Sequence, residues 1–165
     1  MDHAKAGFTY LIETIKDGVV IDSETVHNLI PTEGINYLIS TGLKGGAAIT
    51  SWYVGLYEGA YTPIAGDTAA TFPAAATEST AYAETARQAL TLGTVSGGSV
   101  DNSASLAQFT GNTNGKVIQG GFIVSAPTKG AATGTLISAV KFSSPKPFDA
   151  GIILRVSAGF QITSA

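Results

Sequence analysis

The sequence predicts an all-β protein: one domain, a β-sandwich of jelly-roll type, with one short α-helix near residues 32–41. Three observations support this prediction. Apolar and polar residues alternate over residues 152–163, shorter segments alternate in the same way, and turns rich in Gly or Pro separate them. The 165 residues suffice for one domain with a sizeable core, and no repeat of fixed length indicates a solenoid or propeller.

The first thirty residues are predicted to form a β-hairpin or an arm, and residues 31–165 the sandwich domain. The Asp17-Gly18 pair is typical of a tight turn between two strands, and Val19 begins the return strand. Three alternate positions place apolar side chains on one face of the first strand: Phe8, Tyr10 and Ile12. We expect this segment either at an edge of the main sheet or as an arm that reaches a neighbouring molecule.

A short helix is predicted directly after Pro31. Thr32 can serve as its N-cap, and Glu33 follows where the helix dipole favours a negative charge. Gly42 is the expected end of the helix. Spacings of i, i+3 and i+4 give it one apolar stripe, formed by Ile35, Leu38 and Ile39. This stripe is expected to pack on the β core and close one of its open ends.

Residues 50–59 have the pattern of a half-buried strand. Its two faces alternate, with Trp52, Val54 and Leu56 on one side and Tyr53, Gly55 and Tyr57 on the other. Residues 60–81 contain two prolines, many alanines and no sustained period, which predicts a long ordered loop. Loops of this length are often functional, and Tyr61, Ile64 and Phe72 are expected to fasten it to the body or to a partner.

The C-terminal half has the clearest strand pattern. Strands are predicted from about Arg87, over 106–110 and at three longer segments, whereas residues 95–100 are predicted as a turn-rich connection. The sets expected to share a face are Ile118, Gly120, Phe122 and Val124; Leu136, Ser138, Val140 and Phe142; and Ile152, Leu154, Val156, Ala158, Phe160 and Ile162.

Composition excludes several function classes. Charged residues make up 13% of the chain, about half the ~25% of a typical soluble domain. Such a surface gives little protection against association, so it favours contact with other proteins. The nine Lys and Arg residues form no basic stripe, so neither a nucleic-acid partner nor a polybasic membrane anchor is predicted.

Other sequence features bear on redox chemistry and location. The absence of Cys excludes disulfides, zinc thiolates and a Cys nucleophile. No apolar run approaches the ~20 residues of a membrane span. The N-terminus lacks the features of a signal peptide, so export by lysis or within a particle is expected.

No catalytic, cofactor-binding or metal-binding residue is predicted, and no enzyme activity. His3 and His27 have no nucleophile and acid at short spacing. A carboxylate pair or a calcium loop would need regular spacing, so four scattered acids are predicted to be solvated: Glu58, Asp67, Glu78 and Glu84. Residues 111–117 lack the spacing of a phosphate loop and are predicted to form a β-turn, with Asn and Gly in left-handed conformations.

Three segments resemble small virion proteins of tailed bacteriophages, and the similarity runs from about residue 30 to the end. They are Pro31-Thr32-Glu33-Gly34-Ile35-Asn36-Tyr37-Leu38, Trp52-Tyr53-Val54-Gly55-Leu56-Tyr57-Glu58-Gly59 and Gly66-Asp67-Thr68-Ala69-Ala70-Thr71-Phe72-Pro73. The resemblance implies a structural protein, made in the host cytoplasm and placed on the capsid surface of the virion. It would be a decoration (cement) protein that binds the major capsid protein and itself forms a dimer or trimer.

Two alternatives remain open from the sequence: a tail-associated or fibre-associated structural component, and a carbohydrate-binding adhesion module. The residues expected to make intermolecular contacts lie in the N-terminal hairpin and the long loop, and are Phe8, Tyr10, Ile12, Tyr61 and Phe72. Burial of weakly charged surface across joints between capsid subunits would supply the binding energy.

Overall fold

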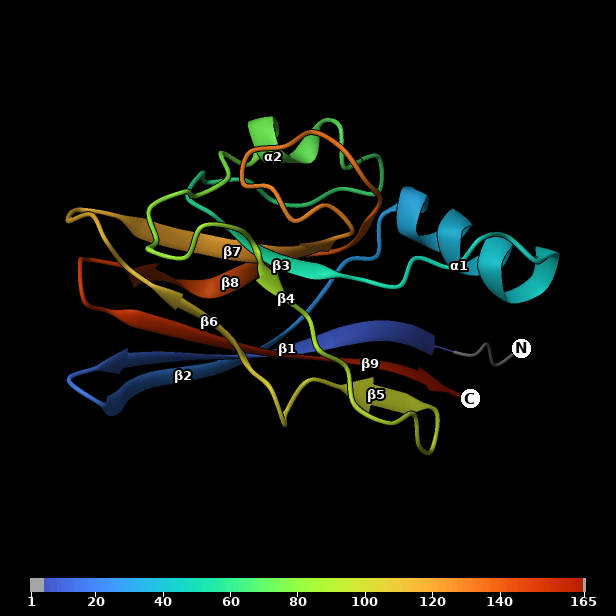
Figure 1. Cartoon of the computed structure of the whole chain (residues 1–165), viewed down its shortest axis with the longest axis horizontal. Coiled ribbons are helices and arrows are strands. Elements are labelled where there is room, and N and C mark those ends of the chain that lie inside the picture. The colour runs from blue at the N-terminus through green and yellow to red at the C-terminus, as the bar shows by residue number, and fades with distance from the viewer. Residues whose placement is uncertain (1–4, 165) are drawn as a thin grey trace.

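The computed structural model describes residues 5–164 and contains two antiparallel β-sheets, so the predicted all-β sandwich is confirmed. Figure 1 shows the two sheets stacked face to face. In chain order the elements are β1 (Lys5–Lys16), β2 (Val19–His27), α1 (Thr32–Lys44), β3 (Tyr53–Tyr57), α2 (Phe72–Ala75), β4 (Gln88–Ala89), β5 (Ser99–Asp101), β6 (Ala107–Thr110), β7 (Val117–Val124), β8 (Leu136–Pro147) and β9 (Ile153–Thr163).

Sheet A has the strand order β2-β1-β9-β5, and β6 pairs with the other half of the same edge of β9. Sheet B has the order β4-β3-β7-β8. Consecutive strands therefore enter the two sheets in pairs, and β9 returns to sheet A at the end of the chain. The β1–β2 and β7–β8 connections are hairpins within one sheet.

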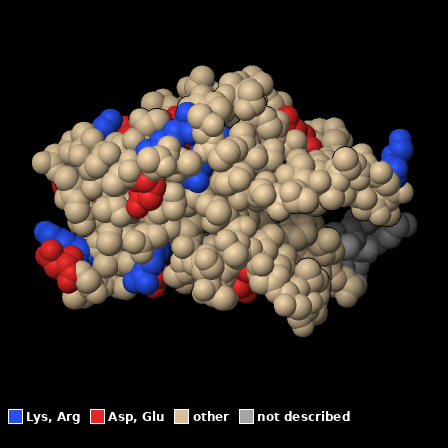
Figure 2. Space-filling model, in the orientation of Figure 1, with Lys and Arg blue, Asp and Glu red and all other residues tan. Residues whose placement is uncertain are grey.

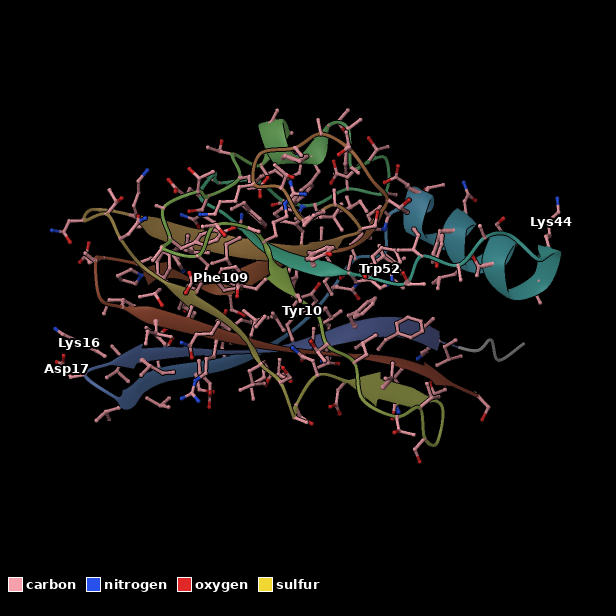
Figure 3. The ribbon with its side chains drawn as sticks, viewed as in Figure 1. Tyr10, Lys16, Asp17, Lys44, Trp52 and Phe109 are labelled. Carbon is pink, nitrogen blue, oxygen red and sulfur yellow. The ribbon has the colours of Figure 1, made fainter. Side chains whose placement is uncertain are left out.

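The main core fills the space between the sheets. Figure 3 shows Tyr10 and Phe109 in this space. Both side chains are fully buried, as are Val54, Leu56 and Leu154. A second apolar cluster lies on the other side of sheet B, around Tyr57, Phe72, Phe122, Val124 and Leu136. Sheet B is therefore covered on both faces, whereas the outer face of sheet A remains exposed.

The N-terminal hairpin forms as predicted, but it is not an arm. β1 lies between β2 and β9, and its register with β9 runs without a break from Lys5 to Ile15. The same strand supplies three core side chains, Phe8, Tyr10 and Ile12. The proposed boundary near residue 30 therefore separates two parts of one folded unit, because β1 is a central strand of sheet A.

Strand β3 differs from the half-buried strand that was predicted. Val54 and Leu56 face the main core as expected, but Gly55 and Tyr57 are also buried. The reason is the long loop, which folds back over the outer face of sheet B and places α2 there (Figure 1). Only part of this loop is irregular, since Phe72–Ala75 form the short helix α2.

Two irregularities of strand pairing change the predicted faces of β7 and β8. The register between these strands shifts between Ile118 and Gly120, and again between Ile123 and Val124. Ile118 therefore faces the main core, whereas Phe122 and Val124 face the second cluster. Leu136 likewise joins the second cluster and not its expected companions Val140 and Phe142.

Strand β9 keeps the predicted alternation along its middle. Leu154, Val156 and Ala158 are buried, but Ile162 is 50% exposed near the end of the strand. β5 was predicted as part of a turn. It is a three-residue edge strand whose Val100 lies opposite Phe160 of β9.

Helix α1 is longer than predicted, and a different face of it packs on the body. It begins at Thr32 with Pro31 as N-cap, and it ends at Gly45, which adopts a left-handed conformation. Gly34 is the buried position, because a Cβ there would lie 2.9 Å from the backbone of Ile137. This close approach fixes the rotation of the helix, so Tyr37 and Leu38 reach the core. Of the predicted stripe, Leu38 packs on the core, whereas Ile35 and Ile39 are exposed.

Candidate interaction surface

The structure does not support most of the predicted contact residues as contacts to another molecule. Phe8 is 5% exposed, and Tyr10, Ile12 and Phe72 are fully buried. The hydroxyl of Tyr10 donates to Ser138 Oγ at 2.6 Å, which joins the two sheets. These four side chains are therefore not available at the surface of one chain. For Phe8, Tyr10 and Ile12, alternation identified an apolar face but not what covers it, and Phe72 lies in a loop without a period. Tyr61 alone remains partly exposed.

Tyr61 belongs to a polar network beneath the long loop. Its hydroxyl donates to Asp67 Oδ1 at 2.6 Å, and Asp67 Oδ2 accepts the Ile64 N–H at 2.8 Å. The hydrogen bond to the Asp67 carboxylate raises the pKa of Tyr61 above its ordinary value. The Tyr61 ring packs edge-on against Phe72 at 5.8 Å between centroids. Tyr61 therefore fastens the loop to the body, which was one of its two predicted roles.

The three segments that carry the resemblance meet in space. Glu33 Oε2, in the first turn of α1, accepts the N–H of Ala69 at 2.8 Å and of Leu136 at 2.7 Å. The Thr32 N–H donates to the carbonyl of Ala65 at 2.9 Å. Tyr57 of β3 then packs edge-on against Phe72 of the loop. These three segments therefore hold α1, the long loop and sheet B together.

The four acidic residues expected in solvent are mostly used as internal acceptors. Asp67 is 4% exposed, and the Glu78 side chain is 2% exposed. Glu78 accepts two hydrogen bonds from Arg87, at 2.8 and 2.7 Å. Glu58 pairs with Lys116, and both oxygens of Glu84 accept the backbone N–H of Thr110. The prediction that these side chains are solvated is therefore wrong for Asp67 and Glu78, which are buried and hydrogen-bonded within the fold.

His27 is the one histidine among residues 5–164. His27 is exposed and its Nδ1 lies 3.1 Å from Thr9 Oγ1, while His3 lies outside the described residues. In the same range, no three metal-ligating side chains come together. No described helix has the length and apolar character required to cross a membrane.

The loop at residues 111–115 is a turn that connects β6 and β7. Gly115 adopts a left-handed conformation and donates its N–H to Asp149 Oδ1 at 2.7 Å. The predicted left-handed backbone conformation is wrong for Asn112 and Asn114. Among the described residues other than Gly, only Asp17 and Thr77 have a positive φ. Asn114 instead accepts the Ala150 N–H through its side chain.

The outer face of sheet A is the first surface available to a partner. It is formed by alternate residues of the three long strands, namely Gly7, Thr9, Leu11 and Glu13; Ser23, Thr25 and His27; and Arg155, Ser157, Gly159 and Gln161. Glu13 and Arg155 lie 3.7 Å apart on this face, and the strand register places Lys5 of β1 and Asp101 of β5 on it as well. Gly, Ser and Thr make up most of the remaining residues, so few formal charges would lose solvent if a partner covered this face.

The second available surface is the helix-end patch, formed by Ile35, Ile39 and Leu43 of α1 and by Ile162 of β9. These side chains are 44%, 48%, 83% and 50% exposed. A groove of about 830 Å³ separates the helix from the ends of β1 and β9, and Ala6, Leu29, Ile30, Leu38 and Phe160 line it. None of the described residues that line this groove is charged.

The apolar spacing in the sequence identifies the exposed residues of α1 in this patch, but it predicted that they pack on the core. Ile35, Leu38 and Ile39 were predicted as one stripe against the core, and only Leu38 packs there. The stripe continues along the helix to Gly42 and Leu43, beyond the predicted end of the helix. That continuation is visible in the sequence, and it marks a helix whose apolar stripe extends past the sandwich (Figure 1).

Comparison of the chain with protein-family models, curated proteins and solved structures gives no match.

Proposed function

We propose that this protein is a structural component of a tailed-phage virion that decorates the capsid and stabilises it through protein–protein contacts. The observation that supports the proposal most directly is the outer face of sheet A. It is a broad strand surface without a core contact, and its charges are few, with Glu13 close to Arg155. Binding such a face to the major capsid protein requires little desolvation of charge.

The interior of the molecule supports the same proposal. Buried ion pairs and side chain–backbone bonds hold the long loop and the sheets in one arrangement, as in Arg87–Glu78 and Glu33–Ala69. A preorganised surface loses little conformational entropy when it binds. On a closed shell with many equivalent positions, modest contacts of this kind become collectively stable. The location implied is the capsid surface, with synthesis in the host cytoplasm.

Addition of charge to the outer face tests this proposal. Thr25 and Ser157 lie on either side of Leu11 in the sheet register. The double substitution Thr25→Glu and Ser157→Glu should reduce co-sedimentation of the purified protein with undecorated capsids by at least about tenfold. The matched control carries Thr113→Glu and Ala132→Glu, at exposed positions on loops outside sheet A, and should bind like the natural chain.

Three outcomes would count against the proposal. Equal binding by both double variants would show that the outer face is not the contact. Localisation of the protein to the tail by electron microscopy of labelled particles would favour the tail alternative. Specific binding on a glycan array, without binding to capsids, would favour an adhesion module. Each measurement uses the full chain, and circular dichroism checks that the variants are folded.

A further inference from the structure

We propose that the helix-end patch is a two-fold interface between two copies of this chain. The first reason is the position of the apolar side chains. Ile35, Ile39 and Leu43 are spaced by four residues and form one ridge along α1. The groove of about 830 Å³ lies directly beside this ridge. A two-fold contact requires one surface that carries both a projection and its complement, and this patch carries both.

The second reason is Gly42, which lies in the last turn of α1 and lines the groove. A glycine within a helix destabilises it by up to about 1 kcal/mol relative to alanine. No atom lies within 4 Å of the position that a Cβ would occupy at Gly42, so packing within one chain does not require glycine there. Close approach of a second helix to this position supplies the missing reason, because small residues let backbones come near.

The third reason is charge. A two-fold contact places equal charges opposite each other, so it is favourable only where the centre of the patch is neutral. The described residues that line the groove include no charged side chain. In Figure 2 the α1 end of the molecule is largely free of charged side chains in this view, and Figure 3 places Lys44 at the tip of the helix. Lys44 would therefore lie at the rim of the interface.

The exposed apolar area provides a large part of what an interface needs. The four exposed side chains of the patch present roughly 400 Å² in each copy, which is comparable to the largest apolar patch on a typical monomer. Two copies would bury about 800 Å² from these residues alone, and the groove walls would add to it. This approaches the ~1,200 Å² at which specific protein–protein interfaces begin. With one ridge of four-residue spacing on each helix, the two helices would cross at about −50°.

Sedimentation velocity of the purified full chain tests this inference. Protein concentrations of up to ~100 µM are measured, and a particle with twice the 16.8 kDa mass of one chain is expected within this range. Leu43→Glu and, separately, Gly42→Arg should raise the dissociation constant at least about tenfold. Neither residue has a buried role in one chain, since Leu43 is 83% exposed and Gly42 faces open space. Both variants should therefore keep the circular dichroism spectrum and melting temperature of a folded domain.

The matched control is Val19→Glu, which adds the same charge at a position that is 62% exposed on the β1–β2 hairpin, away from α1 (Figure 1). It should leave the dimer intact. A natural chain that is monomeric throughout the range, or trimeric, would overturn the inference, as would a dimer unaffected by both α1 variants. Capsid binding is measured separately on the outer face of sheet A, so failure here is distinguishable from failure of the proposed function.

Discussion

At the scale of single residues, Arg87 shows how the protein uses its few charges. Its side chain is fully buried and contacts the long loop and the β7–β8 connection together. The guanidinium donates to both oxygens of Glu78 and to the carbonyls of Ala126 and Ala131, each at 2.7–2.9 Å. It also lies over the Phe122 ring, 5.2 Å from its centroid. Such a buried charge is tolerated because its hydrogen-bonding capacity is largely satisfied.

Substitution of Arg87 by Met is expected to lower the free energy of unfolding by about 3–5 kcal/mol, because Glu78 would remain buried without its cation. Urea unfolding followed by the fluorescence of Trp52, the one tryptophan of the chain, measures this change. The double variant Arg87→Met with Glu78→Gln should lose less of the free energy of unfolding than the single variant, because it no longer contains the uncompensated carboxylate.

The control for Arg87 is Lys116→Met, which breaks the ion pair between Lys116 and Glu58. These side chains are 36% and 20% exposed, so solvent screens their attraction. A loss below about 1 kcal/mol is expected. A similarly small loss in Arg87→Met would show that the buried pair contributes little, and would contradict the role assigned to it here.

At the scale of elements, the two sheets are joined along one side by Lys146 of β8. Its Nζ donates to Asp22 Oδ2 at 2.6 Å and lies 3.3 Å from Glu24 Oε2, both on β2. The Lys146 side chain is 2% exposed, whereas that of Asp22 is 49% exposed. The hydrogen bond from Lys146 keeps the pKa of Asp22 below its ordinary value. This contact connects sheet edges that share no backbone hydrogen bonds.

The Asp22 contact predicts a dependence of stability on pH. A carboxyl whose pKa is lower in the folded state stabilises the fold at pH values above its unfolded pKa of about 4, and this stabilisation is lost as the pH falls through the folded pKa. The natural chain should therefore be more stable than Asp22→Asn at pH 7, and the difference should disappear as the pH falls below about 4. Urea midpoints of both proteins at pH 7 and below pH 4 measure it.

Solvent exposure of Asp22 limits the expected difference at pH 7 to about 1 kcal/mol or less. A difference between the two proteins that stays constant over this pH range would exclude the ionised Asp22 as its source. Lys146→Met provides a second comparison, because it should remove most of the same pH dependence while leaving Asp22 in place.

Glu33 holds the first turn of helix α1 in place, and loss of this contact should be detectable at the two amide groups that it binds. In Glu33→Gln a neutral carbonyl replaces the carboxylate that accepts the N–H groups of Ala69 and Leu136. Hydrogen bonds to a charged group contribute about 1.5–3 kcal/mol, so part of this stabilisation should be lost. Amide exchange at Ala69 and Leu136 should become at least about tenfold faster than in the natural chain. Unchanged exchange at both amides would contradict this assignment.

Elements were predictable from sequence where one face meets solvent and the other meets the core. Strand β9 has this environment, and its alternation identified Leu154, Val156 and Ala158 correctly. Strand β3 does not, because the long loop buries Tyr57 on the face that was expected to be half exposed. Local periodicity carries no information about a loop that returns over a sheet.

The same limit explains the errors at the candidate surfaces. Phe8 was predicted as a contact because its hairpin could be an arm, and Phe72 because it lies on a long irregular loop. Their neighbours, such as Phe160 and Phe122, are distant in the chain and cover them in the fold. In α1 the close approach of Gly34 to β8 decided which side of the helix faces outward. Exposure of Ile39 is thus a consequence of tertiary packing that hydrophobic spacing does not specify.

At the scale of the whole molecule, the first and last strands depend on each other. β1 pairs with β9 along eleven consecutive residue pairs, from Lys5 with Thr163 to Ile15 with Ile153. β9 also pairs with β5 and β6, so it connects the N-terminal hairpin to the middle of the chain. Closure of sheet A therefore requires both ends of the chain, and the hairpin cannot be removed as an independent arm.

Deletion of residues 1–28 should accordingly unfold the domain. It would expose one edge of β9, remove Phe8, Tyr10 and Ile12 from the main core, and leave Ser138 without the Tyr10 hydroxyl. Removal of a single large core side chain costs about 2–5 kcal/mol, so loss of three is comparable to the whole stability of a typical domain, about 5–15 kcal/mol. We expect loss of cooperative thermal unfolding and of the far-ultraviolet β-sheet signal. A truncated chain that still unfolds cooperatively would show that residues 29–165 contain a complete core, and that the hairpin is an appendage after all.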